Sequence, residues 1–300
     1  MMSVVRAVVI HEFGGRDKLR LEDVSEPKLF PDAVRIRIRA AGVNPVDCKT
    51  REGRQEPRFP HVFPVVLGWD AAGVVEEVGP ATRWFKPGDE VYAYCRKHFV
   101  GEGTYTEQVV VPDGFVARLP RNLNFAEAAA VPLAALTAYQ CLVEQLQIKP
   151  GETVLVHAAA GGVGHFAVQI ARELGAKPIG TASPRNHDFL RELGCIDAID
   201  YHEGDFPGVD AAIDPIGGET LEKTLSVAGR TVSIVQPGDT HGYHFVRPSG
   251  AELSVLTGWI EDGRVRVHLD DTFPLDEAAA AHERLEEGHV RGKIALTVSE

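Results

Sequence analysis

Residues 153–164 read Thr153-Val154-Leu155-Val156-His157-Ala158-Ala159-Ala160-Gly161-Gly162-Val163-Gly164, and this stretch decides the fold of the chain. The apolar run 153–157 is typical of a buried strand, and the residues from Val163 to Leu174 have the pattern of a helix. A strand that enters a helix through a glycine-rich turn is the context that a dinucleotide-binding fingerprint requires. The turn reads A-x-G-x-x-G, with Ala159 in the place of the first glycine.

This turn predicts where the phosphates of a dinucleotide would bind. A residue without a side chain at Gly161 lets the backbone approach a pyrophosphate, and Gly164 lets the helix pack closely on the strand. The free N–H groups at the start of the helix favour an anion. The predicted contacts are Ala159, Ala160, Gly161, Gly162, Val163 and Gly164. The alternative is a tight strand–helix turn that binds nothing.

The end of the second strand, 178–182, indicates which dinucleotide is preferred. An NAD site carries Asp or Glu there to bind the ribose hydroxyls. This chain instead reads Ser183-Pro184-Arg185-Asn186, and its first acid is Asp188, inside the next helix. Ser183 and Asn186 can form hydrogen bonds, and Arg185 can pair with a 2′-phosphate. The sequence therefore predicts NADPH as cofactor, with Arg185 as a solvated first-turn residue as the alternative.

Outward from this motif, the chain divides into a β-rich part and an α/β part. Strands alternate with helices from 153 to 247, which predicts a doubly wound parallel sheet. Earlier, 34–40 alternates apolar residues with Arg35, Arg37 and Arg39, typical of a half-buried strand. The three arginines are interpreted as its solvated face, with an anion-binding stripe as the alternative. A helix over 125–147 is expected, with a capping box formed by Asn124 and Glu127, and strands are expected at 243–247 and 265–269.

Composition excludes several classes of protein. The 300 residues carry a net charge of −12, which disfavours nonspecific binding to nucleic acid or to anionic membranes. The longest apolar stretch, 125–143, contains Glu127, Pro132 and Gln140 and is a poor membrane span. The four cysteines form no CxxC pair, as expected of free thiols in a reducing compartment. We expect a cytoplasmic protein.

Four motifs resemble the medium-chain dehydrogenase/reductase superfamily, in its zinc-free, quinone oxidoreductase-like branch. They are 41–47 (AGVNPVD), 68–75 (GWDAAGVV), the run 157–164 and 290–293 (VRGK). The resemblance implies an α/β protein with a GroES-like β-barrel catalytic domain, built from both chain ends, and an inserted Rossmann domain. The expected boundaries are 1–122 and 251–300 for the catalytic domain and 123–250 for the Rossmann domain. It also implies a homodimer.

The resemblance further implies site residues. Asn44 would lie near the nicotinamide, Thr137 would contact the cofactor, and Tyr201 would lie on the adenine side. Phe245 and Val246 would lie where a late strand meets the nicotinamide, and Asp47 and Asp70 also match family positions. Structural alternatives are an Asx-turn for Asn44, a capping hydroxyl for Thr137 and core packing for the two aromatic residues.

No metal is expected. By the same resemblance, zinc-dependent relatives carry Cys at the position of Asn44 and His at that of Trp69, and neither residue here is a suitable ligand. His241-x-x-His244 is interpreted as an ordinary pair of loop histidines.

The expected activity is zinc-independent, NADPH-dependent hydride transfer to a quinone or to the activated C=C bond of an α,β-unsaturated carbonyl. The sequence leaves these two acceptors open. An NADPH-binding protein with little turnover is the alternative from another class. Gln55 stands where several quinone reductases carry Tyr, in a polar stretch, 51–58, that suits a flexible lip. No dedicated proton donor is evident, and Tyr105, Lys49 and solvent remain candidates.

Overall fold

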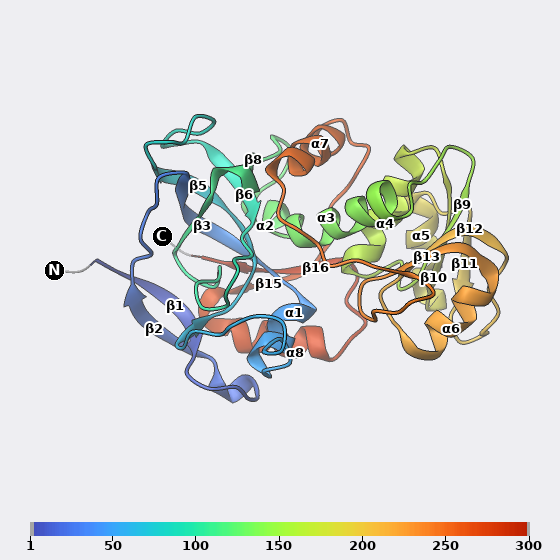
Figure 1. Cartoon of the computed structure of the whole chain (residues 1–300), viewed down its shortest axis with the longest axis horizontal. Helices are drawn as coiled ribbons and strands as arrows, with labels where there is room; N and C mark the ends of the chain where they lie inside the picture. The colour runs from blue at the N-terminus through green and yellow to red at the C-terminus, as the bar shows by residue number, and fades with distance from the viewer. Residues whose placement is uncertain (1–2, 299–300) are drawn as a thin grey trace. The chain divides into compact units, whose positions relative to one another are not determined.

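The computed structural model describes residues 3–298 and shows two compact units (Figure 1). Unit 1 comprises the chain up to residue 133, residues 248–261 and the chain from residue 269. Unit 2 comprises residues 134–247 and 262–268. In residues 3–298, no helix has both the length and the apolar character needed to cross a lipid bilayer.

Unit 1 contains two sheets and four α-helices. The first sheet has the order β2-β1-β4, with β1 (Val4–Ile10), β2 (Arg20–Ser25) and β4 (Val65–Val66). The second has the order β15-β16-β3-β5-β6-β8, and β7 pairs with β3. Its strands are β3 (Ala33–Val43), β5 (Asp70–Val78), β6 (Glu90–Tyr94), β7 (Gln108–Pro112), β8 (Val116–Arg118), β15 (Leu269–Pro274) and β16 (Lys293–Thr297). The helices are α1 (Pro45–Arg51), α2 (Phe125–Ala129), α7 (Gly250–Glu261) and α8 (Ala278–Glu286).

The segment around Tyr105 joins the two sheets. The N–H of Val8 in β1 donates to the carbonyl of Tyr105 over 2.8 Å, and the N–H of Ile38 in β3 donates to the carbonyl of Glu107 over 2.8 Å. Because the backbone groups of this segment are shared between both sheets, Tyr105 is fixed in the interior and is fully buried.

Strand β3 confirms the predicted alternation. Its apolar side chains are buried, whereas Arg35 forms an ion pair with Glu77 on β5 over 3.2 Å and Arg37 pairs with Glu76. The solvated-face interpretation thus holds for Arg37, whose side chain is exposed, whereas the side chain of Arg35 is largely covered by its ion-pair partners.

Unit 2 is built on a six-stranded parallel sheet with the order β11-β10-β9-β12-β13-β14 (Figure 1). Its strands are β9 (Thr153–Val156), β10 (Lys177–Ala182), β11 (Asp197–Asp200), β12 (Val209–Asp214), β13 (Ala228–Ser233) and β14 (Gly242–Tyr243). Its helices are α4 (Gly162–Glu173), α5 (His187–Leu193) and α6 (Gly218–Val227), and α3 (Pro132–Gln140) begins in unit 1. The strand order reverses at β9, the point where α/β sheets bind ligands.

The single helix expected over 125–147 is wrong. The chain forms α2, a break, α3 and a π-helical turn at Cys141–Gln145. Proline lacks an N–H donor and disfavours helix at the preceding residue, so Pro132 separates α2 from α3. The predicted capping box is confirmed: Asn124 and Glu127 exchange two side-chain-to-backbone hydrogen bonds of 2.9 Å.

Two expected strands are also wrong in place or length. Segment 265–269 reaches a strand only at Leu269, because the amide of Gln169 takes up both the N–H and the C=O of Arg266, over 2.8 and 3.0 Å. Segment 243–247 pairs only at its first residue, because the amide of Gln140 binds the N–H and C=O of Arg247, over 3.1 and 3.0 Å. In each case a glutamine side chain replaces a neighbouring strand.

Candidate active site

The glycine-rich turn of unit 2 leaves backbone donors open at the start of α4. Gly161 is the N-cap and carries no side chain to cap the helix. The N–H groups of Gly162, Val163 and Gly164 have no acceptor within residues 3–298, as is normal for the first turn of a helix. These three donors, with the positive end of the helix dipole, form a site for an anion.

Gly164 and Gly161 are glycine for different structural reasons. A Cβ atom at Gly164 would lie 2.3 Å from the carbonyl oxygen of Ala158, so only glycine allows the helix to pack on the turn. A Cβ at Gly161 would meet only that same oxygen, at 3.2 Å. Apart from this oxygen the space beside Gly161 is open, which fits a cradle for a pyrophosphate group.

The polar residues after β10, predicted to bind a 2′-phosphate, lie together. The N–H of Asn186 donates to the carbonyl of Ser183 over 2.8 Å, and its side-chain amide lies 3.4 Å from the Ser183 hydroxyl. Arg185, between them, is exposed. Because β10 pairs with β9, this polar group stands beside the glycine-rich turn at the same edge of the sheet. A hydroxyl, a guanidinium and an amide, with no carboxylate, suit a phosphorylated ribose.

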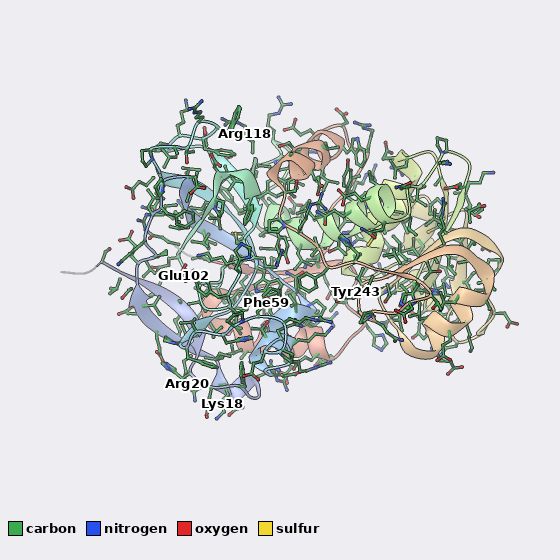
Figure 2. The ribbon with its side chains drawn as sticks, in the orientation of Figure 1. Lys18, Arg20, Phe59, Glu102, Arg118 and Tyr243 are labelled. Atoms are coloured by element: carbon green, nitrogen blue, oxygen red, sulfur yellow. The ribbon has the colours of Figure 1, made fainter. Side chains whose placement is uncertain are left out.

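The remaining predicted residues of unit 2 are placed by two elements. Tyr201 follows edge strand β11, is 44% exposed, and its ring lies 4.1 Å from that of His202. It is therefore not a core aromatic residue. Thr137 is buried on α3, and Val246 is buried just after β14, whose residue Tyr243 is labelled in Figure 2. Phe245, beside Val246, is half-buried.

Gln140, which holds these parts of unit 2 together, was not predicted as a site residue. Its side chain is fully buried and, besides Arg247, contacts the imidazole of His244 at 2.9 Å. One turn of α3 separates it from Thr137, so the same contact fixes Thr137 relative to Val246. The only signal in the sequence is an isolated amide in an apolar helix. His241 contacts the carbonyl of Gln236, at 2.9 Å, so the two loop histidines have separate partners.

In unit 1, Asn44 is the N-cap of α1 and is 1% exposed. Its backbone N–H donates to Asp47 over 2.8 Å, and the two residues form a capping box at the start of the helix. The side-chain N–H donates to Asp70 over 2.8 Å, and the side-chain oxygen accepts from the ammonium of Lys293. The side chain of Asn44 therefore makes contacts beyond those of an Asx-turn with Asp47.

Lys293 was missed as a site residue, although it belongs to one of the four motifs that carry the family resemblance. It lies at the start of β16, is 3% exposed, and also donates to the carbonyl of Val43 over 2.8 Å. The antiparallel pairing of β16 with β3 brings this residue next to Asn44, across 249 residues of sequence.

A second set of buried hydrogen bonds leads from Asp47 toward the surface. Asp47 accepts from the hydroxyl of Tyr105 over 3.2 Å, Tyr105 contacts His282 at 3.2 Å, and His282 contacts Arg51 at 3.1 Å. Arg51 donates in turn to Glu286 over 2.6 Å. A guanidinium can only donate, so Nδ1 of His282 accepts and Nε2–H donates to Tyr105. The hydroxyl hydrogen of Tyr105 is therefore donated to Asp47.

Burial dominates the electrostatics of this cluster. It raises the pKa of Asp47 to about 7 and that of Asp70 to about 6, and it lowers the pKa of Lys293. The other oxygen of Asp47, Oδ1, is buried without a hydrogen-bond partner within residues 3–298, which favours the neutral carboxyl. Two buried carboxyl groups thus lie near one buried ammonium, and Asp47 is the more easily protonated of the two.

Aromatic rings stand beside this cluster. The ring of Trp69, adjacent in sequence to Asp70, lies 5.8 Å from that of Phe59 (labelled in Figure 2) and 6.1 Å from that of Tyr94. Gln55, at the position where several quinone reductases carry Tyr, is 4% exposed, and its carbonyl accepts from the N–H groups of Arg58 and Phe59. The segment expected to be a flexible lip is therefore a series of hydrogen-bonded turns.

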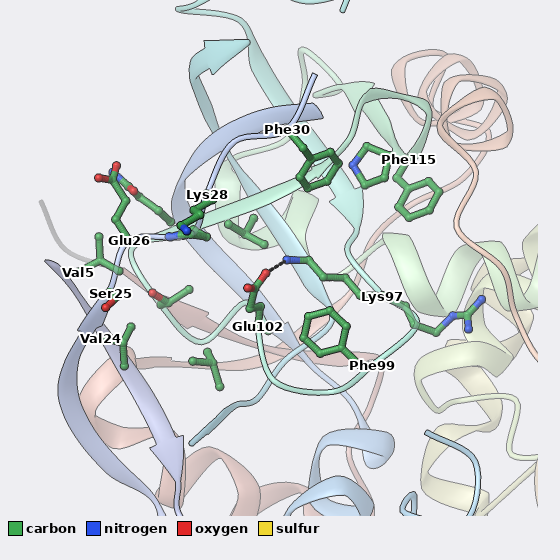
Figure 3. Close-up of a pocket in the computed structure, with 18 of the residues that line it drawn as sticks. Val5, Val24, Ser25, Glu26, Lys28, Phe30, Lys97, Phe99, Glu102 and Phe115 are labelled. Atoms are coloured by element: carbon green, nitrogen blue, oxygen red, sulfur yellow. Dashed lines mark hydrogen bonds and ion pairs between the residues drawn. The ribbon is translucent and has the colours of Figure 1, made fainter. Parts of the chain in front are cut away.

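A cavity of about 680 Å³ lies elsewhere in unit 1 (Figure 3). It is lined mainly by apolar side chains, including Val24, Phe30 and Phe99, and the ion pair of Lys97 with Glu102 crosses it. None of the predicted site residues lines this cavity. The volume of this cavity alone therefore does not identify it as the active site.

Fold and site together define a nucleotide-dependent dehydrogenase architecture. The model of the alcohol dehydrogenase GroES-like domain matches residues 30–121, and that of the zinc-binding dehydrogenase domain matches residues 193–296. The NADPH-dependent alkenal/one oxidoreductase of Arabidopsis thaliana chloroplasts is 34% identical, over 97% of this chain and 79% of the relative. The human quinone oxidoreductase is 33% identical, over 98% of each chain. The solved quinone oxidoreductase of Coxiella burnetii superimposes with a TM-score of 0.89 at 32% identity, covering 99% of this chain and all of that one.

The chain belongs to the medium-chain dehydrogenase/reductase family, in its quinone oxidoreductase-like branch. It is an oxidoreductase with a GroES-like unit and a Rossmann unit, so the predicted resemblance, fold class and enzyme class are confirmed. Asn44 belongs to unit 1, whereas the other predicted cofactor residues belong to unit 2.

Proposed function

We propose that the protein is an NADPH-dependent oxidoreductase that transfers a hydride to a quinone or to the activated C=C bond of an α,β-unsaturated carbonyl compound. The observation that carries the proposal is the buried cluster of Asn44, Lys293 and Asp70 in unit 1. It offers hydrogen-bond donors and a positive charge, which suit an oxyanion, in a chain whose other unit carries a dinucleotide turn. The relatives named for alkenal/one and quinone reduction support the same acceptors.

The residues of unit 2 fit NADPH. The open space at Gly161 and the unpaired N–H groups of residues 162–164 would hold the pyrophosphate, with Ala159 and Ala160 in the same turn. Ser183, Arg185 and Asn186 would bind the phosphorylated ribose, because a guanidinium pairs with phosphate in a bidentate manner. In the proposed complex, Tyr201 flanks the adenine, while Thr137, Phe245 and Val246 contact the nicotinamide side.

The residues of unit 1 do not fit a catalytic zinc ion, although one matching family model is described as zinc-binding. Within residues 3–298 no group of three or more His, Cys, Asp or Glu side chains is arranged to hold a metal. The oxygen of Asn44 accepts from the ammonium of Lys293, whose charge would repel a cation. We therefore propose a zinc-independent enzyme.

The chemistry needs no metal for such acceptors. NADPH, when bound, supplies a hydride and is released as NADP⁺. The β-carbon of the enone accepts the hydride with its electron pair, and the carbonyl oxygen takes up negative charge as an enolate. A proton from water then adds to the α-carbon and gives the saturated carbonyl compound. For a quinone, the corresponding product is the hydroquinone. The protein orients the acceptor and stabilises the oxyanion with fixed donors.

The proposal extends to assembly and compartment. Strand β14 is the edge of the unit 2 sheet, and an edge strand can pair with its copy across a two-fold axis, which supports a homodimer. All four cysteines are free and buried, in keeping with a reducing, cytoplasmic setting. Light scattering tests this assembly, and a monomeric mass would contradict it.

The activity is tested by following NADPH absorbance in the presence of EDTA. The acceptors are a benzoquinone, a naphthoquinone, a 2-alkenal and a cyclic enone, each with a control that lacks enzyme. We expect turnover that EDTA does not reduce, and the preferred acceptor distinguishes quinone from enone reduction. Loss of turnover in EDTA would contradict zinc independence. Saturable NADPH binding without oxidation by any acceptor would favour a binding protein of the same fold.

A further inference from the structure

Two buried groups leave the side-chain amide of Asn44 with a single orientation. An ammonium can only donate hydrogen bonds, so the amide oxygen must face Lys293. A carboxylate can only accept, so the amide nitrogen must face Asp70, at 2.8 Å. An amide carries two N–H groups, and only one of them is used. The second has no partner within residues 3–298.

Asp70 is itself held in place. Its second oxygen accepts from the backbone N–H of Leu133 over 2.9 Å. The neighbouring Gly42 leaves room for it, since a Cβ at Gly42 would lie 3.1 Å from the carboxylate and 2.3 Å from the carbonyl of Ala129. The carboxylate therefore cannot turn to offer Asn44 a different atom, and the amide is locked from both sides.

Lys293 is an unusual residue to find in this position. It is 3% exposed, and burying an ammonium is costly unless opposite charges compensate it. The compensating groups are Asp70 on β5 and Asp47 on α1, both fully buried. Two of its three N–H donors go to Asn44 and Val43, and the third has no acceptor within residues 3–298. A lysine needed only for packing could be replaced by an apolar residue of similar length.

We propose that Lys293 is a positioning residue of the reductive reaction, which fixes Asn44 so that its unused N–H is presented to the carbonyl oxygen of the acceptor. The inference rests on the proposed function. As the hydride reaches the β-carbon, that oxygen gains a negative charge. The Asn44 N–H then donates to the enolate, and the nearby ammonium lowers its energy through a dry, low-dielectric interior. No proton leaves Lys293, and water supplies the proton that completes the reduction.

The test compares three variants in the NADPH oxidation assay. Lys293→Met keeps the length and removes the charge, Lys293→Arg keeps the charge, and Lys97→Met removes a lysine that is paired with Glu102 at the separate cavity. We expect Lys293→Met to lower kcat about 100-fold or more, the usual effect of losing an oxyanion group. The KM for NADPH and its Kd, from nicotinamide fluorescence, should change less than threefold. The kcat of Lys293→Arg should be about tenfold higher than that of Lys293→Met, and the kcat of Lys97→Met should resemble that of the wild type.

A double-mutant cycle keeps the inference falsifiable if Lys293→Met folds poorly. Lys293→Gln still donates to Asn44 without a charge, and it is combined with Asn44→Ala. If Lys293 acts through Asn44, the double variant should lose no more kcat than the worse single variant. Multiplicative losses, or a kcat for Lys293→Met within threefold of wild type, would overturn the inference alone. Absence of wild-type turnover would overturn the proposed function and the inference with it.

Discussion

The two units bury their polar groups in opposite ways. Unit 1 encloses fully charged side chains, including Asp70, Lys293 and Arg51, each matched by a partner. Unit 2 encloses mostly neutral groups, such as His157, which is held between the hydroxyls of Thr181 and Thr224 at 3.2 and 2.7 Å. Unit 1 therefore offers fixed charges to a substrate, whereas unit 2, whose buried polar groups are mostly neutral, offers free backbone donors to a phosphate.

The largest loss of stability should come from removing one of the buried charges of unit 1. Asp70→Asn removes the nearest counter-charge of Lys293, and we expect the free energy of unfolding to fall by about 3–5 kcal/mol, as when one partner of a buried pair is removed. Glu77→Gln, on the same strand, removes a carboxylate whose side chain is 59% exposed. It should cost less than about 1 kcal/mol.

Urea denaturation at pH 8, where Asp70 is ionised, measures both variants. Equal losses for Asp70→Asn and Glu77→Gln would show that the buried cluster is no more sensitive than the surface, and the contrast between the units would fail.

A buried group in each unit should change the free energy of unfolding with pH, in opposite directions. Burial lowers the pKa of His157 to about 4, below the 6.5 of an unfolded histidine. Its contribution to stability is complete above pH 6.5 and falls by up to about 3 kcal/mol as the pH drops to 4. Asp47 behaves oppositely. Its pKa of about 7 lies above the unfolded value of 3.8, so its contribution decreases as the pH rises between these values.

Urea denaturation of the wild type, His157→Gln and Asp47→Asn between pH 4 and 8 tests both signs. The stability difference between wild type and His157→Gln should grow with pH, whereas that between wild type and Asp47→Asn should shrink. Parallel pH profiles for the two variants would contradict the assignment of a neutral histidine to unit 2 and a proton-holding carboxyl to unit 1.

The smallest loss of stability should come from a substitution at the exposed Arg185 of unit 2. Arg185→Ala removes an exposed side chain, so we expect a stability change of less than about 0.5 kcal/mol. Affinity for NADPH should fall by about 1.5–3 kcal/mol, the value of a hydrogen bond to a charged group, while affinity for NADH should not change. Fluorescence titrations with both cofactors measure this. Equal weakening of the two would refute the assignment of Arg185 to the 2′-phosphate.

Much of unit 2 could be predicted because its signals are local. The residues from Thr153 to Gly164 specify strand, turn and helix over a short stretch. In unit 1, the cap at Asn124 and Glu127 is local in the same way, because it is set within four positions. Backbone sterics and hydrogen bonds between near neighbours decide such features, so the order of the residues is sufficient. The chemistry of Ser183 and Arg185 likewise follows from their place at the end of a strand.

The tertiary structure alone decided the rest. Lys293 meets Asn44 across 249 residues, and Tyr105 meets His282 across 177, because strand pairing brings distant segments together. The strands expected at 243–247 and 265–269 fail because the side chains of Gln140 and Gln169 satisfy the backbone groups that a strand would have used. Sequence thus determined the local elements and the cofactor turn. The buried charge cluster depends on which distant groups share an interior without water, and only the folded chain sets that.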